Sequence, residues 1–458
     1  MYSIGELKTL IILSFNGCSI VELPAKIGNL THLKLLDLTH CSMLKRISPE
    51  VISRLKQLEE LYLERSGLKW VVGEEGKQEN EVNLEELGSL RNLIALTTLL
   101  PTADFPGSNS LFKNLLSFRI NISPVTFPST ELFPGHVPVG SLHELRTLHV
   151  QGCNKLLNVV PSYLLQGLSN LKVLTVTDCA SMVEVTFPSI ELHGLRLIQV
   201  QGCNKLLNVV PSDLLQGLSN LVELSVTDCA SLVEVFEVEV LNVEESDIVP
   251  LSELKELYLV YLPKLTHILK REPKGTLCFQ SLTVLYVWNC NKLRNLFSAS
   301  IAKSAEQLQE LGIEKCKMME EIVIKGENEE EYRTDKITMP QLKRLKLFDL
   351  PNLTSFCRDV NAFDLPSLKH VTIEHCPKMK TPPFGFASTP KPTELEYRLP
   401  SFAKSKYEDL VHNVVEKQLE VNESSKDDGN DSFDDEGDGD GDGDDSSDDR
   451  WQWRCHRR

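Results

Sequence analysis

The chain has 458 residues, with 65 acidic side chains against 48 lysines and arginines and a net charge of −17. Residues 423–449 hold fourteen acids and one lysine and residues 450–458 add four arginines, which leaves −8 for residues 1–422. No stretch is basic enough to follow a phosphate backbone, so the composition disfavours nucleic-acid binding. No apolar stretch is long enough to span a bilayer, which disfavours a membrane protein.

The phrase Leu-x-x-Leu-x-Leu-x-x-Cys recurs along the chain and is plainest at Leu145–Cys153 and Leu282–Cys290. Its apolar residues alternate, so they share one face of a short strand, and stacked copies bury that face. Such recurrence predicts an α/β leucine-rich-repeat solenoid, a horseshoe with a parallel concave sheet and about fourteen irregular repeats. The first leucines of the copies are Leu10, Leu33, Leu58, Leu93, Leu115, Leu145, Leu171, Leu195, Leu221, Leu254, Leu282, Leu308, Leu342 and Leu368.

One block of repeats is nearly duplicated. Residues 150–185 return as residues 200–235 with five differences in thirty-six positions. Three differences flank the strand leucines on the side expected to face solvent: Lys172/Val222, Val173/Glu223 and Thr175/Ser225. Contact with different partner groups would explain them, but unconstrained drift at exposed positions is the better explanation for only three changes.

Nine of the twelve cysteines occupy the ninth position of the phrase: Cys18, Cys41, Cys153, Cys179, Cys203, Cys229, Cys290, Cys316 and Cys376. A small thiol there can bond to neighbouring loop backbone, so we interpret the row as a reduced, structural cysteine ladder that fits the cytosol. No Cys or His spacing indicates zinc. The acidic run at 438–449 imitates a calcium loop only weakly, so we predict no metal and no cofactor.

Residues that flank the strand leucines are the best candidates for binding a partner. In the later repeats several become aromatic or charged, and these residue types dominate protein-interface hot spots. Large aromatic side chains on a solvated face are also unfavourable unless something covers them. The candidates are Tyr258, Tyr261, Tyr286, Trp288, Glu314, Arg344, Phe348, His370 and Glu374.

The composition predicts three regions along the chain. Residues 1–380 form the solenoid, residues 381–422 a linker with one short helix, and residues 423–458 a disordered acidic tail with a basic end. The first residues match the return half of a repeat and show no polar cap, so we expect a fragment of a longer protein or a truncated gene product. No secretory signal is evident, which favours a cytoplasmic location.

The repeats resemble the leucine-rich-repeat region of plant nucleotide-binding, leucine-rich-repeat disease-resistance proteins of the coiled-coil type. Characteristic stretches are residues 27–38, 347–353 and 373–379, and the resemblance covers residues 1–380. It implies an intracellular recognition module, without enzymatic activity, that senses a pathogen effector or a modified host protein. It also implies restraint of a nucleotide-binding switch domain, which this chain does not contain.

Two other classes of protein carry similar repeats. An F-box-type substrate adaptor of a ubiquitin ligase also has a cysteine ladder, but its return segments form regular helices and an F-box precedes its repeats. Here the return segments are short and irregular, as at residues 155–161. An extracellular receptor would need a signal peptide and a membrane span. The plant defence module is therefore the leading interpretation, with the ligase adaptor as the alternative.

Overall fold

The chain divides into two units, Met1–Glu396 and Tyr397–Arg458. The computed structural model describes parts of the first unit: residues 4–71, 81–99, 111, 113–121, 142–153, 168–183, 192–211, 215–237, 251–269, 279–324, 336–357 and 362–379. The predicted linker and acidic tail lie outside the described residues, as do residues 154–167 in the first copy of the duplicated block.

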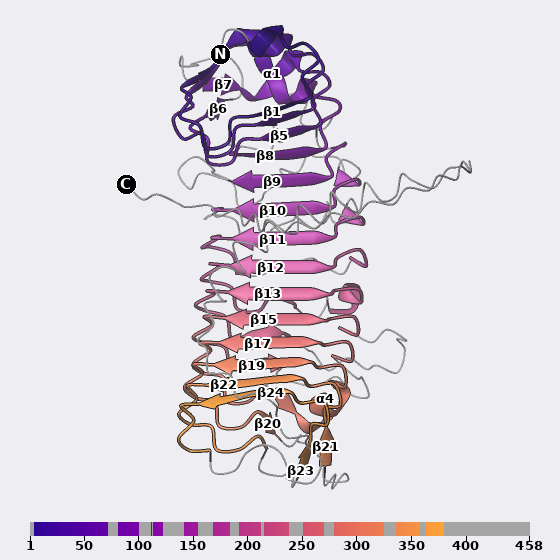
Figure 1. Cartoon of the computed structure of the whole chain (residues 1–458), viewed down its shortest axis with the longest axis vertical. Helices are drawn as coiled ribbons and strands as arrows, with labels where there is room; N and C mark the ends of the chain where they lie inside the picture. The colour runs from indigo at the N-terminus through magenta and orange to yellow at the C-terminus, as the bar shows by residue number, and fades with distance from the viewer. Residues whose placement is uncertain are drawn as a thin grey trace, which may run out of the picture. The chain divides into compact units, whose positions relative to one another are not determined.

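Fourteen strands form one sheet in chain order, and each pairs in parallel with the next (Figure 1). Every strand begins two residues after one of the fourteen leucines that open the predicted repeats, which confirms the predicted solenoid and its repeat positions. The strands are β1 (Ile12–Ser14), β3 (Leu35–Asp37), β5 (Glu60–Tyr62), β8 (Ala95–Leu99), β9 (Ser117–Asn121), β10 (Thr147–Gln151), β11 (Val173–Thr177), β12 (Leu197–Gln201), β13 (Glu223–Thr227), β15 (Glu256–Val260), β17 (Val284–Trp288), β19 (Glu310–Glu314), β22 (Arg344–Phe348) and β24 (His370–Glu374).

The core lies on one side of this sheet. In β17 the second and fourth residues, Leu285 and Val287, are fully buried, and the same two positions of β15 hold the buried Leu257 and Leu259. Burying an aliphatic side chain of this size contributes roughly 1.5–3 kcal/mol. One continuous cluster of buried side chains runs from repeat to repeat, because each strand cannot cover its apolar face alone.

Where the structure describes them, the return segments contain few helices. They carry five short parallel pairs: β2 (Glu22–Leu23) with β4 (Arg46–Ile47), β6 (Lys69–Val71) with β7 (Glu81–Asn83), β14 (Glu234–Phe236) with β16 (His267–Leu269), β18 (Phe297–Ser298) with β20 (Val323–Ile324), and β21 (Lys336–Thr338) with β23 (Ala362–Asp364). The helices among the described residues are the 3-10 turns η1 (Ile4–Glu6), η2 (Ala25–Asn29), η3 (Leu84–Ser89) and η6 (Gln216–Leu218) and the short α1 (Val51–Arg54) and α4 (Ala299–Ser304). Within the described ranges, no helix is long and apolar enough to cross a membrane.

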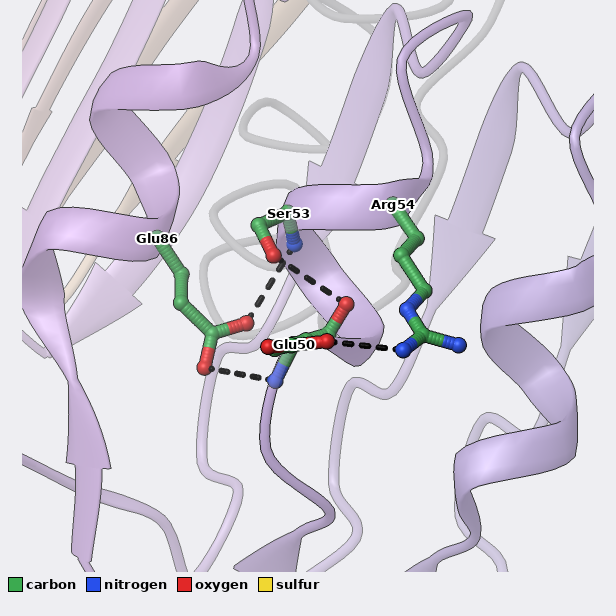
Figure 2. A network of polar contacts seen from close by, with 4 residues as sticks. All are labelled: Glu50, Ser53, Arg54 and Glu86. Atoms are coloured by element: carbon green, nitrogen blue, oxygen red, sulfur yellow. Dashed lines mark hydrogen bonds and ion pairs between the residues drawn. The ribbon is translucent and has the colours of Figure 1, made fainter.

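A carboxylate from a neighbouring return segment caps the helix α1 (Figure 2). Glu50 precedes the helix with a left-handed backbone and offers no side-chain cap. Glu86, in η3, instead accepts hydrogen bonds from the backbone N–H of Glu50 at 3.2 Å and of Ser53 at 3.3 Å. These are among the N–H groups that a helix start leaves unpaired, so Glu86 ties two successive return segments together.

Candidate protein-binding surface

The first, third and fifth residues of the longer strands point away from the core, and we call these positions the outer face. In β11 to β13 the third position holds small or neutral polar side chains, namely Thr175, Gln199 and Ser225. From β15 onward the outer face becomes aromatic and charged. All nine candidate residues from the sequence lie on β15, β17, β19, β22 or β24, or directly follow β15.

Tyr258 and Tyr286 occupy the third position of adjacent strands, and their Cα atoms are paired in the parallel register. Tyr258 is nonetheless only 7% exposed, which corrects the expectation that it presents its ring to solvent. Its hydroxyl donates to the Glu256 carboxylate at 2.6 Å. Because the ring is already covered, a partner would gain little apolar contact from Tyr258.

Tyr286, by contrast, is half-buried and joins a network that crosses three strands. Its hydroxyl donates to Glu314 Oε1 at 2.9 Å, and Lys346 Nζ lies 2.7 Å from the same oxygen. Gly312 makes room for the ring, because a Cβ atom there would lie 2.6 Å from Tyr286 Cδ2. Glu314, which Lys346 holds in turn, and the space at Gly312 therefore fix the direction of the Tyr286 ring before any partner binds.

The exposed Tyr261 and the half-buried Trp288 form an aromatic pair with their ring centroids 4.6 Å apart and their planes tilted by 55°. Lys315 Nζ lies 5.7 Å from the centroid of the Trp288 ring, within range of a cation–π interaction. The three side chains come from three successive repeats, after β15, in β17 and after β19. Tyr261 is 41% exposed, so this cluster, unlike Tyr258, offers aromatic surface to a partner.

The remaining candidates lie on the last two strands. Arg344 forms an exposed ion pair with Glu310 at 2.7 Å, which contributes little stability. Phe348 packs edge-on against His375 with ring centroids 5.3 Å apart. His370 is exposed at the start of β24 and pairs in register with Arg344, and the half-buried Glu374 pairs with Phe348. The structure thus collects the candidates on one face, although it joins them in separate clusters.

The predicted ladder cysteines follow their strands, and all ten cysteines among the described residues are free thiols. Their Sγ–H groups donate to backbone carbonyls, for example Cys41 to Phe15 O at 3.0 Å and Cys316 to Glu314 O at 3.3 Å. Burial raises the pKa of Cys229 and of Cys290, while a hydrogen bond with Cys179 and then burial raise the pKa of Cys203. Cys18 differs because it is exposed. Within the described part of the chain, no group of three or more His, Cys, Asp or Glu residues could hold a metal ion.

Sequence reasoning missed a row of left-handed residues immediately before the ladder position. Their φ angles lie between 52° and 71°, where most side chains are disfavoured. Glycine, asparagine, aspartate and histidine tolerate this backbone best, so their frequency before the ladder was the available signal. Tyr261, Lys315 and Arg65 are the exceptions. The row is Gly17, His40, Arg65, Gly152, Asp178, Gly202, Asp228, Tyr261, Asn289, Lys315, Asp349 and His375.

A second row escaped the sequence analysis at the opposite end of the strands. Asn170 and Asn220 each precede the first leucine of a repeat, and each donates its Nδ2–H to a backbone carbonyl of the previous repeat, at 2.9 and 2.8 Å. Asn92 and Asn114 do the same at 3.1 and 2.6 Å. The dipeptide Asn-Leu at the start of the phrase was the signal for these links. They satisfy loop carbonyls and set the spacing of the turns rather than contact a partner.

Comparison with known families gives two matches that together cover nearly all of the repeats. Residues 184–317 and 306–382 match a family described as plant disease resistance protein RPS2-like, leucine-rich repeats. Residues 2–177 match a family described as a leucine-rich repeat region. The chain is therefore similar to plant disease-resistance proteins over residues 184–382 and to leucine-rich repeat regions over residues 2–177.

Individual relatives agree with this similarity. Disease resistance protein At4g27190 of Arabidopsis thaliana is 26% identical over 403 residues, which covers 84% of this chain but only 35% of that protein. Probable disease resistance protein At4g27220, from the same plant, is 34% identical over 106 residues, covering 23% of this chain and 11% of that protein. The chain thus spans about a third of the length of the first relative.

Solved structures with similar folds are more distant. A functional domain of InlJ from Listeria monocytogenes, whose description notes a cysteine ladder, has 18% identity and a TM-score of 0.39, covering 78% of this chain and 69% of that one. A leucine-rich-repeat protein of Leptospira interrogans has 20% identity and a TM-score of 0.38, covering 69% and 81%.

Proposed function

We propose that this chain recognises a protein in plant defence through the outer face of β15 to β24, because residues 184–382 match a plant disease-resistance leucine-rich-repeat family and residues 2–177 match a leucine-rich repeat region. The partner is a pathogen effector or a host protein altered by one. A nucleotide-binding switch domain, supplied by another part of a longer protein or by another chain, reads out the recognition event. The chain acts by binding rather than by catalysis, in the plant cell interior.

The observation that carries the proposal is the change of the outer face at β15. In β11 to β13 the third positions hold Thr175, Gln199 and Ser225, which are neutral polar side chains and lie buried. From β15 onward, Tyr286 and Trp288 lie on β17 and Phe348 on β22, with the charged Glu310 and Glu314 of β19 between these two strands. Aromatic and arginine side chains supply most of the affinity in protein interfaces, and several here are oriented by hydrogen bonds before a partner arrives.

The proposal is tested by comparing two double variants of the full chain in plant tissue. Arg344→Ala with Phe348→Ala removes two outer-face side chains of β22 that contribute little to the core. The matched control, Leu207→Ala with Val233→Ala, removes two exposed apolar side chains that lie outside the outer face. Each chain carries a proximity-labelling enzyme, and labelled proteins are identified by mass spectrometry and then titrated against the purified chain.

We expect the outer-face variant to lose its defence-related partner with an affinity loss of at least about tenfold, the usual result of removing a hot spot. The control should bind within about twofold of the unaltered chain. Equal binding by both variants would contradict a recognition role for the outer face. Recovery of a ubiquitin-ligase core in place of defence proteins would favour the adaptor function instead.

A further inference from the structure

We propose that the strand-end edge beside β15, β17 and β19 binds a short acidic peptide segment of the partner. We call this surface the basic edge and define it by Tyr261, Trp288 and Lys315 together with Lys264, Lys292 and Lys317. The inference rests on the proposed recognition function and adds the chemistry of the segment that is recognised. Apart from Trp288, the last residue of β17, it concerns the turns after the strands, and so a different set of residues from the outer face of β22.

The charge of the basic edge is the first argument. Lys264, Lys292 and Lys317 are exposed and lie in the turns that follow the three strands. Within the described part of the chain, none of these three lysines forms an ion pair. Lys315 Nζ lies over the ring of Trp288. Four ammonium groups in three successive turns repel one another, and an acidic ligand would relieve that repulsion.

Acidic residues bound this surface on both sides. In the left-handed row, Asp228 precedes Tyr261 by one repeat and Asp349 follows Lys315 by one repeat. Adjacent strands are about 4.8 Å apart, so the interval from Tyr261 to Lys315 spans roughly 10 Å, the length of about three extended residues. A short acidic segment fits this interval. A nucleic acid requires a longer basic track, because its affinity comes from many phosphate contacts.

The turns of the basic edge are held in place by side-chain amides. Asn291 donates its Nδ2–H to Asn289 Oδ1 at 2.8 Å and accepts the backbone N–H of Lys317 at 3.3 Å. Asn352 donates its Nδ2–H to the carbonyl oxygen of Lys317 at 2.7 Å. The backbone positions of Asn289, Asn291 and Lys317 are therefore fixed relative to one another, and less ordering is needed when a ligand binds.

The backbone at Tyr261 and Lys315 supplies an independent argument. Their φ angles are 52° and 55°, a region that bulky side chains adopt only with strain, whereas equivalent turns use Gly152 and Gly202. Strained residues of this kind are concentrated at binding sites, where the strain serves to aim a side chain. Here it places an aromatic ring and an ammonium group on either side of Trp288.

Binding of a defined probe to the purified full chain tests the inference. The probe is a fluorescein-labelled pentapeptide with four aspartates around a central leucine, and its counterpart carries asparagines in place of the aspartates. Fluorescence anisotropy is measured at low salt and at about 300 mM NaCl, where charge interactions are strongly screened. Lys292→Glu with Lys317→Glu reverses the charge of the edge. Lys172→Glu with Lys205→Glu makes the same change of net charge at exposed lysines elsewhere.

We expect the acidic probe to bind, the asparagine probe to bind at least about tenfold more weakly, and salt to weaken the acidic probe. Reversal at Lys292 and Lys317 should weaken the acidic probe by at least about tenfold, and the control pair should stay within about threefold. Lys315→Gly, which relieves backbone strain and leaves the fold intact, should weaken the probe as well. Equal effects of the two lysine pairs, or tighter binding of a single-stranded oligonucleotide than of the peptide, would overturn the inference.

The two proposals fail separately. If the Arg344 and Phe348 variant loses its cellular partner while the Lys292 and Lys317 variant retains it and the probe does not bind, recognition stands and the acidic-segment inference falls. If the probe binds as expected while the outer-face variant retains every partner, the basic edge stands as a peptide site and the outer-face proposal falls.

Discussion

Strands β11 to β13 and strands β15 to β22 share one frame and carry different surfaces. In both regions the second and fourth strand residues are buried leucine, isoleucine or valine. The outer face changes from threonine, glutamine and serine to tyrosine, tryptophan and paired charges. The nearly duplicated block lies in the first region, and its differences include two outer positions, Val173/Glu223 and Thr175/Ser225. The frame is thus the same in both regions while the outer positions differ. Val173, Thr175 and Ser225 are nonetheless buried, which corrects the expectation that these differences face solvent.

The strongest test of this comparison is removal of one core side chain from each region. Leu174→Ala and Leu285→Ala occupy the same position of β11 and β17, and both leucines are fully buried. Each change should lower the free energy of unfolding by roughly 2–5 kcal/mol, because a cavity replaces packed methyl groups. Native-state hydrogen exchange of the strand amides measures the effect repeat by repeat. A loss below about 1 kcal/mol in one region alone would show that the two frames are not equivalent.

The polar network of β17 to β22 provides a smaller effect that should be confined to the second region. Lys346→Met removes the cation beside Glu314, whose side chain is only 10% exposed and also holds the Tyr286 hydroxyl. We expect a loss of about 1–3 kcal/mol, because a nearly buried carboxylate is left without its charged neighbour. Urea unfolding followed by tryptophan fluorescence measures this loss.

Arg344→Met is the matched control on the same strand. Its ion pair with Glu310 is exposed, with side-chain exposures of 64% and 41%, so solvent screens it and the change should be within about 0.5 kcal/mol. Similar losses for Lys346→Met and Arg344→Met would contradict the distinction between a fixed network and an exposed pair.

The frame was predictable from the sequence because its physics is periodic. Alternating leucines located every strand, and their burial follows from the strand geometry alone. The cysteine row was equally visible, although the carbonyls that accept its Sγ–H bonds were not. Each strand begins two residues after the first leucine of its repeat even where the repeats differ in length, as the long interval between β19 and β22 shows.

Features that depend on contacts between repeats were not predictable in the same way. The covered ring of Tyr258 depends on what lies beside it, and the space for Tyr286 depends on Gly312, twenty-six residues later. The cap on α1 comes from Glu86, more than thirty residues away. No local pattern specifies such pairs, because each is set by which side chain the next repeat happens to present. The row of left-handed residues was partly predictable, because glycine, asparagine, aspartate or histidine occupies most of its positions.

The cysteine ladder gives the smallest and most selective test of the two regions. It is continuous through Cys179, Cys203 and Cys229, but leucines replace it at Leu262 and Leu350 on either side of the β17 and β19 repeats. Because neighbouring thiols and burial raise the pKa of these cysteines above the ordinary 9.0, their contribution to stability is complete below pH 9 and is lost as the pH rises. Above that pH each such thiol should lower the free energy of unfolding by up to about 1.4 kcal/mol per pH unit.

Urea unfolding between pH 8 and 10 should therefore show a shallower decline of the unfolding free energy for Cys203→Ala and a steeper decline for Leu262→Cys. Cys18→Ala, at an exposed thiol, is the control. A decline that is the same in all three variants would mean that other groups, rather than the ladder, set the alkaline limit of the frame.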